Sequence, residues 1–525
     1  MLAGRGILLT GATGFLGRYL LGELLSCGHR VAVLVRDSPQ RRAADRVAEL
    51  VASLSAARGQ ELPRAVVVSG ELGLRGLGLS LADRQWLGRR CQAVLHTAAD
   101  ISFHARPDGE PWRTNLDGTR ELLRLCRELG LRECHHVSTA YVCGRRRGAI
   151  SEEDLDRGQG FNNPYEQSKF EAERSVRLAS GLRATVYRPA VIVGDSRTGY
   201  TSSYAGLYRF LELGSRLAQA DPARPPTVGR DAGASPSARR WLPLRLPLSG
   251  NERCNLVPVD WVAKAVVSLL GRPSWHGRTF HLVSRSPVTI RAIQQIAAQE
   301  LGIEGVEFAG AEAPKDAGRL DQLLREGLRE YWPYLAGQPE FLCPNTRAAL
   351  PGLAPPAMDG PMLRRLIHFA VADDWGRARA HAAKEAVDPP ARSLCASYLE
   401  EVFPRQARKS RLAKSAGLNL LVALDIRGPG GGQWSCRWID GELSCVTRGL
   451  EDQAEVTYQT DTATFAAVVQ GRQSPQQAFF EQRIDMRGNL ETALKLAVLF
   501  EQFLRENPYP PADRTEAMDA TPCPA

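Results

Sequence analysis

The stretch "ILLTGATGFLGRYLLGELL", residues 7–25, is typical of a strand, a tight glycine turn and a helix in direct succession. Gly11 permits the turn, Gly14 lets a pyrophosphate approach the backbone, and Gly17 lets the helix pack closely on the strand. The free N–H groups and the positive end of the helix dipole then favour a phosphate. The stretch therefore predicts a dinucleotide-binding βαβ unit.

Short β-branched apolar runs alternate with helical patterns from residue 7 to about 195, among them "VAVLV", "AVVVSG" and "AVLHTAA". This alternation predicts an α/β fold, a doubly wound parallel sheet of the Rossmann type with helices on both faces. Residues 196 to about 250 are rich in Pro, Gly, Ser and Arg and have no period, which predicts a long loop inserted near the substrate side.

Composition limits the classes of function. The 525 residues are 43% hydrophobic and 24% charged, with no apolar run of membrane-spanning length and no signal-peptide pattern. Eleven scattered cysteines without CxxC or clustering with histidine predict reduced thiols in a cytoplasm and no metal site. The net charge of +9 suits a phosphorylated cofactor, an acidic carrier protein or peripheral contact with a lipid surface. A basic stripe interleaved with aromatic residues is missing, which argues against nucleic acid.

Pro389 and Pro390 would break any continuing helix, so we place a domain boundary there. The resulting division predicts a cofactor-binding domain over 1–385, a smaller domain over 391–508 and a disordered tail over 509–525. Within the first domain, the substrate-side region takes up about 196–250 and 285–385.

The second strand ends "VLVRD", where an acidic residue would hold a ribose 2′-hydroxyl and an arginine would hold a 2′-phosphate. Arg36 comes first and Asp37 second, with Arg41 and Arg42 close behind. A guanidinium binds phosphate oxygens in a bidentate fashion, so NADPH is favoured over NADH.

Further motifs follow in order: "SGEL", "HTAAD", "TNLDGTREL", "HVSTAYVCG", "NNPYEQSKFEAE", "YRPAVIVGDSRTG" and "NLVPVDWVAKAV". Over about 280 residues this series resembles the extended short-chain dehydrogenase/reductase family. The segments "HTAADISF", "YRPAVIVGDSRTG" and "YWPYLAGQPEF" are most similar to its thioester and fatty acyl reductase, male-sterility-like branch.

The resemblance assigns roles to Tyr165 and Lys169, which any helix would place on the same face. It implies that Tyr165 exchanges the proton, with a pKa lowered by the neighbouring ammonium and the nicotinamide ring. Lys169 would bind the nicotinamide ribose, and Thr139, with Ser138 as the alternative, would stabilise the substrate oxygen. The cofactor contacts that we predict are Gly11, Thr13, Gly14, Phe15, Leu16, Gly17, Arg36, Glu71, Leu72, Thr97, Ala98, Ala99, Asn115, Tyr165, Lys169, Arg188 and Pro189.

Other polar residues are interpreted as structural. Histidines beside strands, as at His96, His135 and His136, are usually packed or hydrogen-bonded in the core. The run at 152–154 is typical of a capped, solvated helix start. For Asn163, a role at the active site and a role as a helix cap both stay open.

The C-terminal part, about 400–508, resembles the sterol carrier protein type 2 (SCP-2) lipid-binding family through "VALDIRGPGGGQWSCRWIDGELSCVTRG" and the segment that follows. Residues 493–500, "ALKLAVLF", are apolar at seven of eight positions, so this helix must be buried or cover something apolar. A solid core and a cavity for an acyl chain or sterol both fit that pattern; the resemblance favours the cavity.

Together the two halves predict an NADPH-dependent reductase of a hydrophobic acyl thioester, carried by coenzyme A or an acyl carrier protein, to an aldehyde; a second hydride step to the alcohol stays open. One alternative is a hydroxysteroid-type dehydrogenase acting on a sterol or other lipid alcohol. The non-enzyme alternative is a lipid carrier whose reductase fold only senses cofactor. A nucleotide-sugar epimerase would leave the lipid module without a role.

Overall fold

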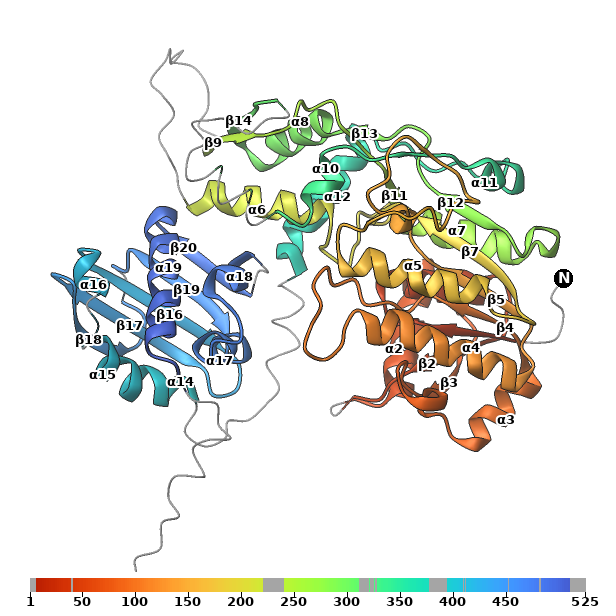
Figure 1. Cartoon of the computed structure of the whole chain (residues 1–525), viewed down its shortest axis with the longest axis horizontal. Helices are drawn as coiled ribbons and strands as arrows, with labels where there is room; N and C mark the ends of the chain where they lie inside the picture. Colours follow the sequence, from red (N-terminus) through yellow and green to blue (C-terminus); the bar gives the residue numbers. More distant parts are fainter. Residues whose placement is uncertain are drawn as a thin grey trace, which may run out of the picture.

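A computed structural model of the chain describes residues 6–38, 41–220, 240–310, 321, 325, 328–376, 394–408, 410, 412–451, 453–480 and 483–509 (Figure 1). The boundary predicted at Pro389 and Pro390, the core of the Pro- and Arg-rich insertion at 221–239 and the tail from 510 lie outside the described residues.

The N-terminal half is built on a parallel sheet of seven strands in the order β12-β7-β5-β4-β1-β2-β3. This arrangement confirms the predicted doubly wound α/β fold. In chain order the strands are β1 (Gly6–Thr10), β2 (Val31–Val35), β3 (Val66–Ser69), β4 (Cys91–His96), β5 (Glu133–Val137), β7 (Arg183–Pro189) and β12 (Thr279–Leu282).

Helices cover both faces of this sheet, and successive residues of β1 supply the two cores. Ile7 and Leu9 pack in a cluster with α1, α2 and α7, whereas Leu8 packs in a cluster with α3, α4 and α5. Such burial on both faces explains the uninterrupted apolar strands. The helices are α1 (Phe15–Ser26), α2 (Ala43–Arg58), α3 (Leu81–Arg90), α4 (Gly118–Leu129), α5 (Pro164–Arg177) and α7 (Val259–Leu270), with short turns η1 (Arg75–Gly78), η2 (Arg113–Asp117), η3 (Ala140–Cys143) and η4 (Pro273–Trp275).

The substrate-side region lies above the carboxyl ends of the strands as small paired strands and helices. The expected long loop over 196–250 is wrong in part, because its apolar residues form helix α6 (Leu207–Ala220) and strand β9 (Arg240–Leu246), which pairs with β14 (Ile303–Phe308). The other elements are β6 (Ala149–Ile150), β8 (Val191–Val193), β10 (Arg253–Cys254), β11 (Leu256–Pro258), β13 (Val288–Thr289), α8 (Ile290–Leu301), α10 (Trp332–Leu335), β15 (Glu340–Phe341), α11 (Pro344–Ala349), α12 (Gly360–Ala372) and η5 (Asp374–Gly376).

The C-terminal part is a five-stranded sheet in the order β18-β17-β16-β19-β20, in which only the β16 and β19 pair is parallel. Its strands are β16 (Leu420–Arg427), β17 (Gly432–Ile439), β18 (Glu442–Arg448), β19 (Val456–Asp461) and β20 (Ile484–Gly488). Its helices are α14 (Leu394–Ser397), η6 (Tyr398–Val402), α15 (Phe403–Ala407), α16 (Leu412–Ser415), α17 (Thr462–Val469), α18 (Pro475–Phe480) and α19 (Leu490–Glu506). We call this part, residues 394–509, the C-terminal module.

Helix α19 contains the apolar run 493–500 and packs against β19 and β20. Ala493 and Ala497 are buried, whereas Lys495 and Val498 are exposed, Val498 by 45%. The helix therefore has one solvent-facing edge and covers the module's sheet and core with its other side. Among the described helices, none combines the length and apolar character that a bilayer crossing requires.

Candidate active site

One cavity of about 1120 Å³ begins at the glycine turn and continues into the substrate-side region. Its wall includes almost all of the predicted cofactor and catalytic residues. These are Gly11, Thr13, Gly14, Phe15, Leu16, Gly17, Arg36, Glu71, Leu72, Thr97, Ala98, Ala99, Thr139, Tyr165, Lys169 and Pro189. Most of them come together because they lie at or just after the carboxyl ends of strands, which share one edge of the parallel sheet, and helix α5 brings Tyr165 and Lys169 to the same edge.

The glycine turn leaves no room for side chains. Gly11 has a φ of +73°, and a Cβ there would lie 2.7 Å from the backbone nitrogen of Ala98. Among the described residues, no side chain caps the start of α1, so its first N–H groups are available to an anion at the cavity wall. The turn therefore fits the pyrophosphate of a nicotinamide dinucleotide.

Two arginines line the cavity beyond β2, Arg36 and Arg46. Arg46, on α2, donates a hydrogen bond of 2.9 Å to the carbonyl oxygen of Arg36. Asp37 is engaged elsewhere, because its carboxylate accepts the Ala43 N–H at 2.7 Å, a bond that lowers the pKa of Asp37 together with one from Ser69. Sequence reasoning missed Arg46, whose only signal was its place in a basic run.

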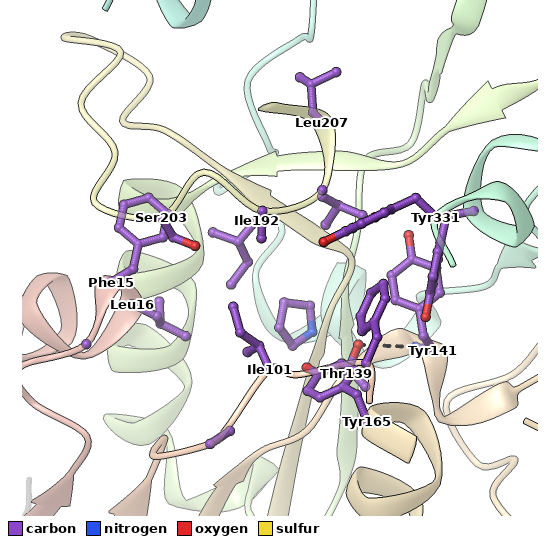
Figure 2. Close-up of a pocket in the computed structure, with 18 of the residues that line it drawn as sticks. Phe15, Leu16, Ile101, Thr139, Tyr141, Tyr165, Ile192, Ser203, Leu207 and Tyr331 are labelled. Carbon is purple, nitrogen blue, oxygen red and sulfur yellow. Dashed lines mark hydrogen bonds between the residues drawn. The ribbon is translucent and has the colours of Figure 1, made fainter. Parts of the chain in front are cut away.

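Thr139, Tyr165 and Lys169 meet where β5 ends. Thr139 caps η3, and its hydroxyl accepts the Tyr141 N–H at 3.3 Å, the bond drawn in Figure 2. The Lys169 ammonium donates to the carbonyl oxygen of Val137 at 2.8 Å, which holds α5 against the strand. Figure 2 shows Thr139 beside Tyr165 on one side of the cavity.

Burial changes the acidity of both titrating groups. It raises the pKa of the Tyr165 phenol to about 12, and a hydrogen bond with Thr139 only partly opposes the rise. It lowers the pKa of the Lys169 ammonium to about 8, opposed by the Glu173 carboxylate. The expected lowering of the Tyr165 pKa is thus absent from the protein alone, because desolvation of the phenolate outweighs the attractions available to it.

Aromatic side chains surround Tyr165. The ring of Phe103 lies 6.1 Å from that of Tyr165, 5.0 Å from Tyr331 and 5.5 Å from Tyr334, measured between centroids. The Tyr334 hydroxyl donates to Glu166 at 2.6 Å and accepts from Asn163 at 2.8 Å. These contacts tie the substrate-side region to the start of α5.

Asn163 also caps α5, because its side-chain oxygen accepts the Glu166 N–H at 3.0 Å. Its role as a helix cap is therefore present, together with a contact that positions Tyr334 beside the cavity.

The predicted cofactor contacts Asn115 and Arg188 do not line the cavity. Arg188 is fully buried behind it, where its guanidinium forms an ion pair of 2.7 Å with Glu173. The side-chain nitrogen of Asn115 donates to the Ser168 hydroxyl and the Asp100 carbonyl oxygen, both at 2.9 Å. The structure thus places both residues as supports of the wall.

The expected solvated helix start at 152–154 is wrong. Glu152 is fully buried and accepts hydrogen bonds from the backbone of His281, Asn345 and Thr346. Its neighbours form no helix, and the carboxylate instead joins three segments distant in sequence.

The core histidines have the structural surroundings that were expected. His96 bonds Thr10 at 2.7 Å, and His135 bonds the Tyr187 hydroxyl at 2.8 Å. The fold does bring ligand atoms of Glu133, His135 and His276 within 4.8 Å of one another, a cluster that sequence spacing did not reveal. The Glu133 carboxylate there already binds the guanidinium of Arg183.

The cavity wall is polar along residues 100–114, which include Arg106, Asp108 and Glu110, and largely apolar on the side of the substrate-side region. The apolar side is formed by residues of α6, β9, α8, β14 and the segment before α10: Leu207, Phe210, Leu211, Leu242, Leu244, Leu246, Ile290, Ile293, Leu301, Ile303, Val306, Leu328, Tyr331 and Trp332. Figure 2 shows Ile101 near Thr139 and Tyr165, with Leu207 across the cavity from them. A cavity with a polar reacting end and an apolar far end fits a molecule with one polar group on a hydrocarbon chain.

Comparison with known proteins agrees with this site. Residues 9–266 match the family model of male sterility proteins, and residues 399–501 match that of the SCP-2 sterol transfer family. The nonribosomal peptide synthetase asaC of Aspergillus flavus is 29% identical over 298 residues, 54% of this chain and 26% of that protein. The fatty acyl-CoA reductase wat of Drosophila melanogaster is 27% identical over 238 residues, 39% of this chain and 46% of that protein.

The chain thus spans less than half the length of these curated relatives. Among solved structures, the terminal R domain of the myxalamid PKS-NRPS pathway is 29% identical, with a TM-score of 0.56, and the match covers 71% of this chain and 92% of that one. Residues 9–266 therefore belong to the male sterility protein family, and residues 399–501 belong to the SCP-2 sterol transfer family.

Proposed function

We propose that the protein is an NADPH-dependent reductase of hydrophobic acyl thioesters, which forms an aldehyde and then the alcohol. One observation carries the proposal: the cavity that holds Thr139, Tyr165 and Lys169 continues without interruption into an apolar compartment. A fatty acyl chain would fill that compartment and gain about 0.8 kcal/mol for each methylene removed from water. The fatty acyl-CoA reductase among the relatives supports this substrate class.

The bound cofactor supplies the hydride. The hydroxyls of Thr139, whose oxygen already accepts the Tyr141 N–H, and of Tyr165 direct their protons to the thioester carbonyl oxygen and stabilise the charge that develops there. The tetrahedral adduct re-forms its carbonyl and expels the thiolate, which takes a proton from water, and the aldehyde results. In a second round the Tyr165 phenol, protonated at neutral pH, gives its proton to the alkoxide and yields the alcohol.

The choice of NADPH rests on Arg36 and Arg46. Both line the cavity at the end of β2, whereas Asp37 serves as a cap for α2 through its bond to Ala43. Two guanidinium groups, beside an Asp37 carboxylate that is engaged by the start of α2, favour a ribose 2′-phosphate.

A sterol alcohol is the second candidate substrate, because residues 399–501 match the SCP-2 sterol transfer family. The two reactions differ in their products. Thioester reduction consumes NADPH and frees a thiol, whereas a hydroxysteroid dehydrogenase would reduce NADP⁺ and free none.

The test follows NADPH consumption, thiol release and organic products together, with hexadecanoyl-coenzyme A as substrate. We expect equal rates of thiol release and aldehyde plus alcohol formation in the wild type, and a loss of at least a hundredfold in Tyr165→Phe. Tyr187→Phe is the matched control, because Tyr187 is buried outside the cavity and bonds His135. NADP⁺ reduction by a sterol without thioester turnover would contradict the proposal.

A further inference from the structure

The C-terminal module packs directly on the wall of the acyl compartment. One apolar cluster contains Leu242, Leu244 and Ile303 from the substrate-side region together with Phe479 and Met486 from the module, all of them buried. Eleven residues of the substrate-side region belong to this cluster, and ten of them line the cavity; Leu213 is the exception. The surface that the module covers is therefore the wall of the substrate compartment itself.

One face of β9 contributes both to the cavity wall and to the apolar cluster shared with the C-terminal module. Leu242, Leu244 and Leu246 alternate along the strand, so their side chains lie on one face, and all three line the cavity and join the shared cluster. The module thus approaches the apolar side of the cavity that β9 forms.

The apolar contacts continue into the module. Tyr458, Ile484 and Leu496 pack against the shared cluster and also against the module's own core. The Tyr458 hydroxyl donates to the Ala493 carbonyl oxygen at 2.6 Å, which fastens α19 to β19 at this place. Apolar side chains therefore lead from the module core to the cavity wall.

An ion pair joins the substrate-side region to the C-terminal module. Arg216 on α6 binds Asp485 on β20 at 2.9 Å, and only 12% of the Arg216 side chain is exposed. Figure 1 shows α6 beside the sheet edge that carries β20. Arg216 also pairs with Glu212, so α6 contributes both the cavity wall and the docking contact.

We propose that this contact is a transfer interface, through which the module passes a long acyl chain into the apolar side of the reductase cavity without release to water. The inference rests on the proposed thioester reduction and adds the route by which the substrate arrives. The occupant of the interface is the chain's own C-terminal module, and the ligand that crosses it is a long-chain acyl thioester.

The test uses the full chain and the variant Asp485→Arg, which sets a second cation against Arg216. Glu501→Arg makes the same change of charge on α19 outside the shared cluster, at a side chain exposed by 22% compared with 25% for Asp485. Asp485→Glu keeps the carboxylate and should restore the contact. Thermal unfolding of each variant verifies that the fold is retained.

We expect Asp485→Arg to raise KM for hexadecanoyl-coenzyme A roughly tenfold, as the loss of about 1.4 kcal/mol would. Butanoyl-coenzyme A, too short to need the route, should be reduced equally by all variants. In a single turnover with prebound hexadecanoyl-coenzyme A, an excess of phosphatidylcholine vesicles should not reduce the product yield of the wild type but should reduce that of Asp485→Arg.

The transfer route would be overturned if vesicles reduced the product yield of the wild type and of Asp485→Arg equally and the ratio of long-chain to short-chain turnover were the same in both. That result would leave the proposed thioester reduction intact. No turnover of either thioester by the wild type would instead overturn the proposed function, and the inference with it.

Discussion

Gly17→Ala tests whether the glycine turn is shaped for a cofactor. A Cβ at Gly17 would lie 1.9 Å from the carbonyl oxygen of Gly11, whereas real contacts stay above 3.0 Å, so the backbone must move by about 1.1 Å (3.0 − 1.9). That oxygen also accepts the Gly14 N–H at 2.9 Å, so its movement opens the turn.

Two effects of opposite sign determine how much Gly17→Ala changes the free energy of unfolding. Overpacking against backbone costs about 1–3 kcal/mol, while replacing glycine by alanine within α1 gains about 1 kcal/mol, which leaves a net loss of up to about 2 kcal/mol in the free energy of unfolding. Because a misplacement of about 1 Å can reduce function on the order of a hundredfold, we expect a rise of that size in the dissociation constant for NADPH.

Gly22→Ala, in the same helix, is the control for Gly17→Ala. Its nearest contact is the guanidinium of Arg58 at 2.9 Å, the far end of a flexible side chain that can move aside. Titration of each protein with NADPH, followed by calorimetry, should give wild-type affinity for Gly22→Ala and weak binding for Gly17→Ala. Equal affinity of the two variants for NADPH would refute the assigned role of the turn.

Three further predictions concern the site. In steady-state kinetics, Arg46→Ala should raise KM for NADPH about tenfold to a hundredfold and leave KM for NADH unchanged. Arg42→Ala is the control and should alter neither KM, because the Arg42 guanidinium pairs with Asp45 outside the cavity. Burial lowers the pKa of Lys169 to about 8, so its ammonium loses a proton as the pH rises through that value. We therefore expect kcat/KM for NADPH to fall tenfold per pH unit above about 8. A Lys169→Arg variant that shows the same decline would contradict this cause. Tyr334→Phe removes the hydroxyl that donates a hydrogen bond to the buried Glu166 carboxylate. We expect the free energy of unfolding, measured by urea denaturation, to fall by about 1–3 kcal/mol. An unchanged urea midpoint would argue against this coupling.

The fold of the first half could be predicted from the sequence because its signals are local. Strand and helix periods, together with the glycine spacing at Gly11, Gly14 and Gly17, specify a βαβ unit within a few residues. Since parallel strands end at one edge of the sheet, the order of motifs then determined which side chains share a cavity.

What the sequence did not reveal depends on contacts between distant segments. Arg188 lies near the end of β7, beside the cavity residue Pro189, but its partner Glu173 holds it behind the wall. Glu152 has the sequence surroundings of a helix cap, but segments more than a hundred residues away supply its donors. Helix α6 was expected as loop because the Pro-rich stretch after it dominates the composition of the segment.

The pKa of Tyr165 bears on the direction of the reaction. Reduction of a carbonyl needs a phenol that can give a proton, whereas oxidation of an alcohol needs a phenolate that can accept one. Burial raises the pKa of Tyr165 to about 12, so the phenol keeps its proton throughout the neutral range. Only the oxidised cofactor brings a positive ring that would stabilise the phenolate, and it is bound before the hydride moves only in the oxidative reaction. In the protein alone, Tyr165 is thus a phenol, the form that donates a proton in the reductive step of the proposed function.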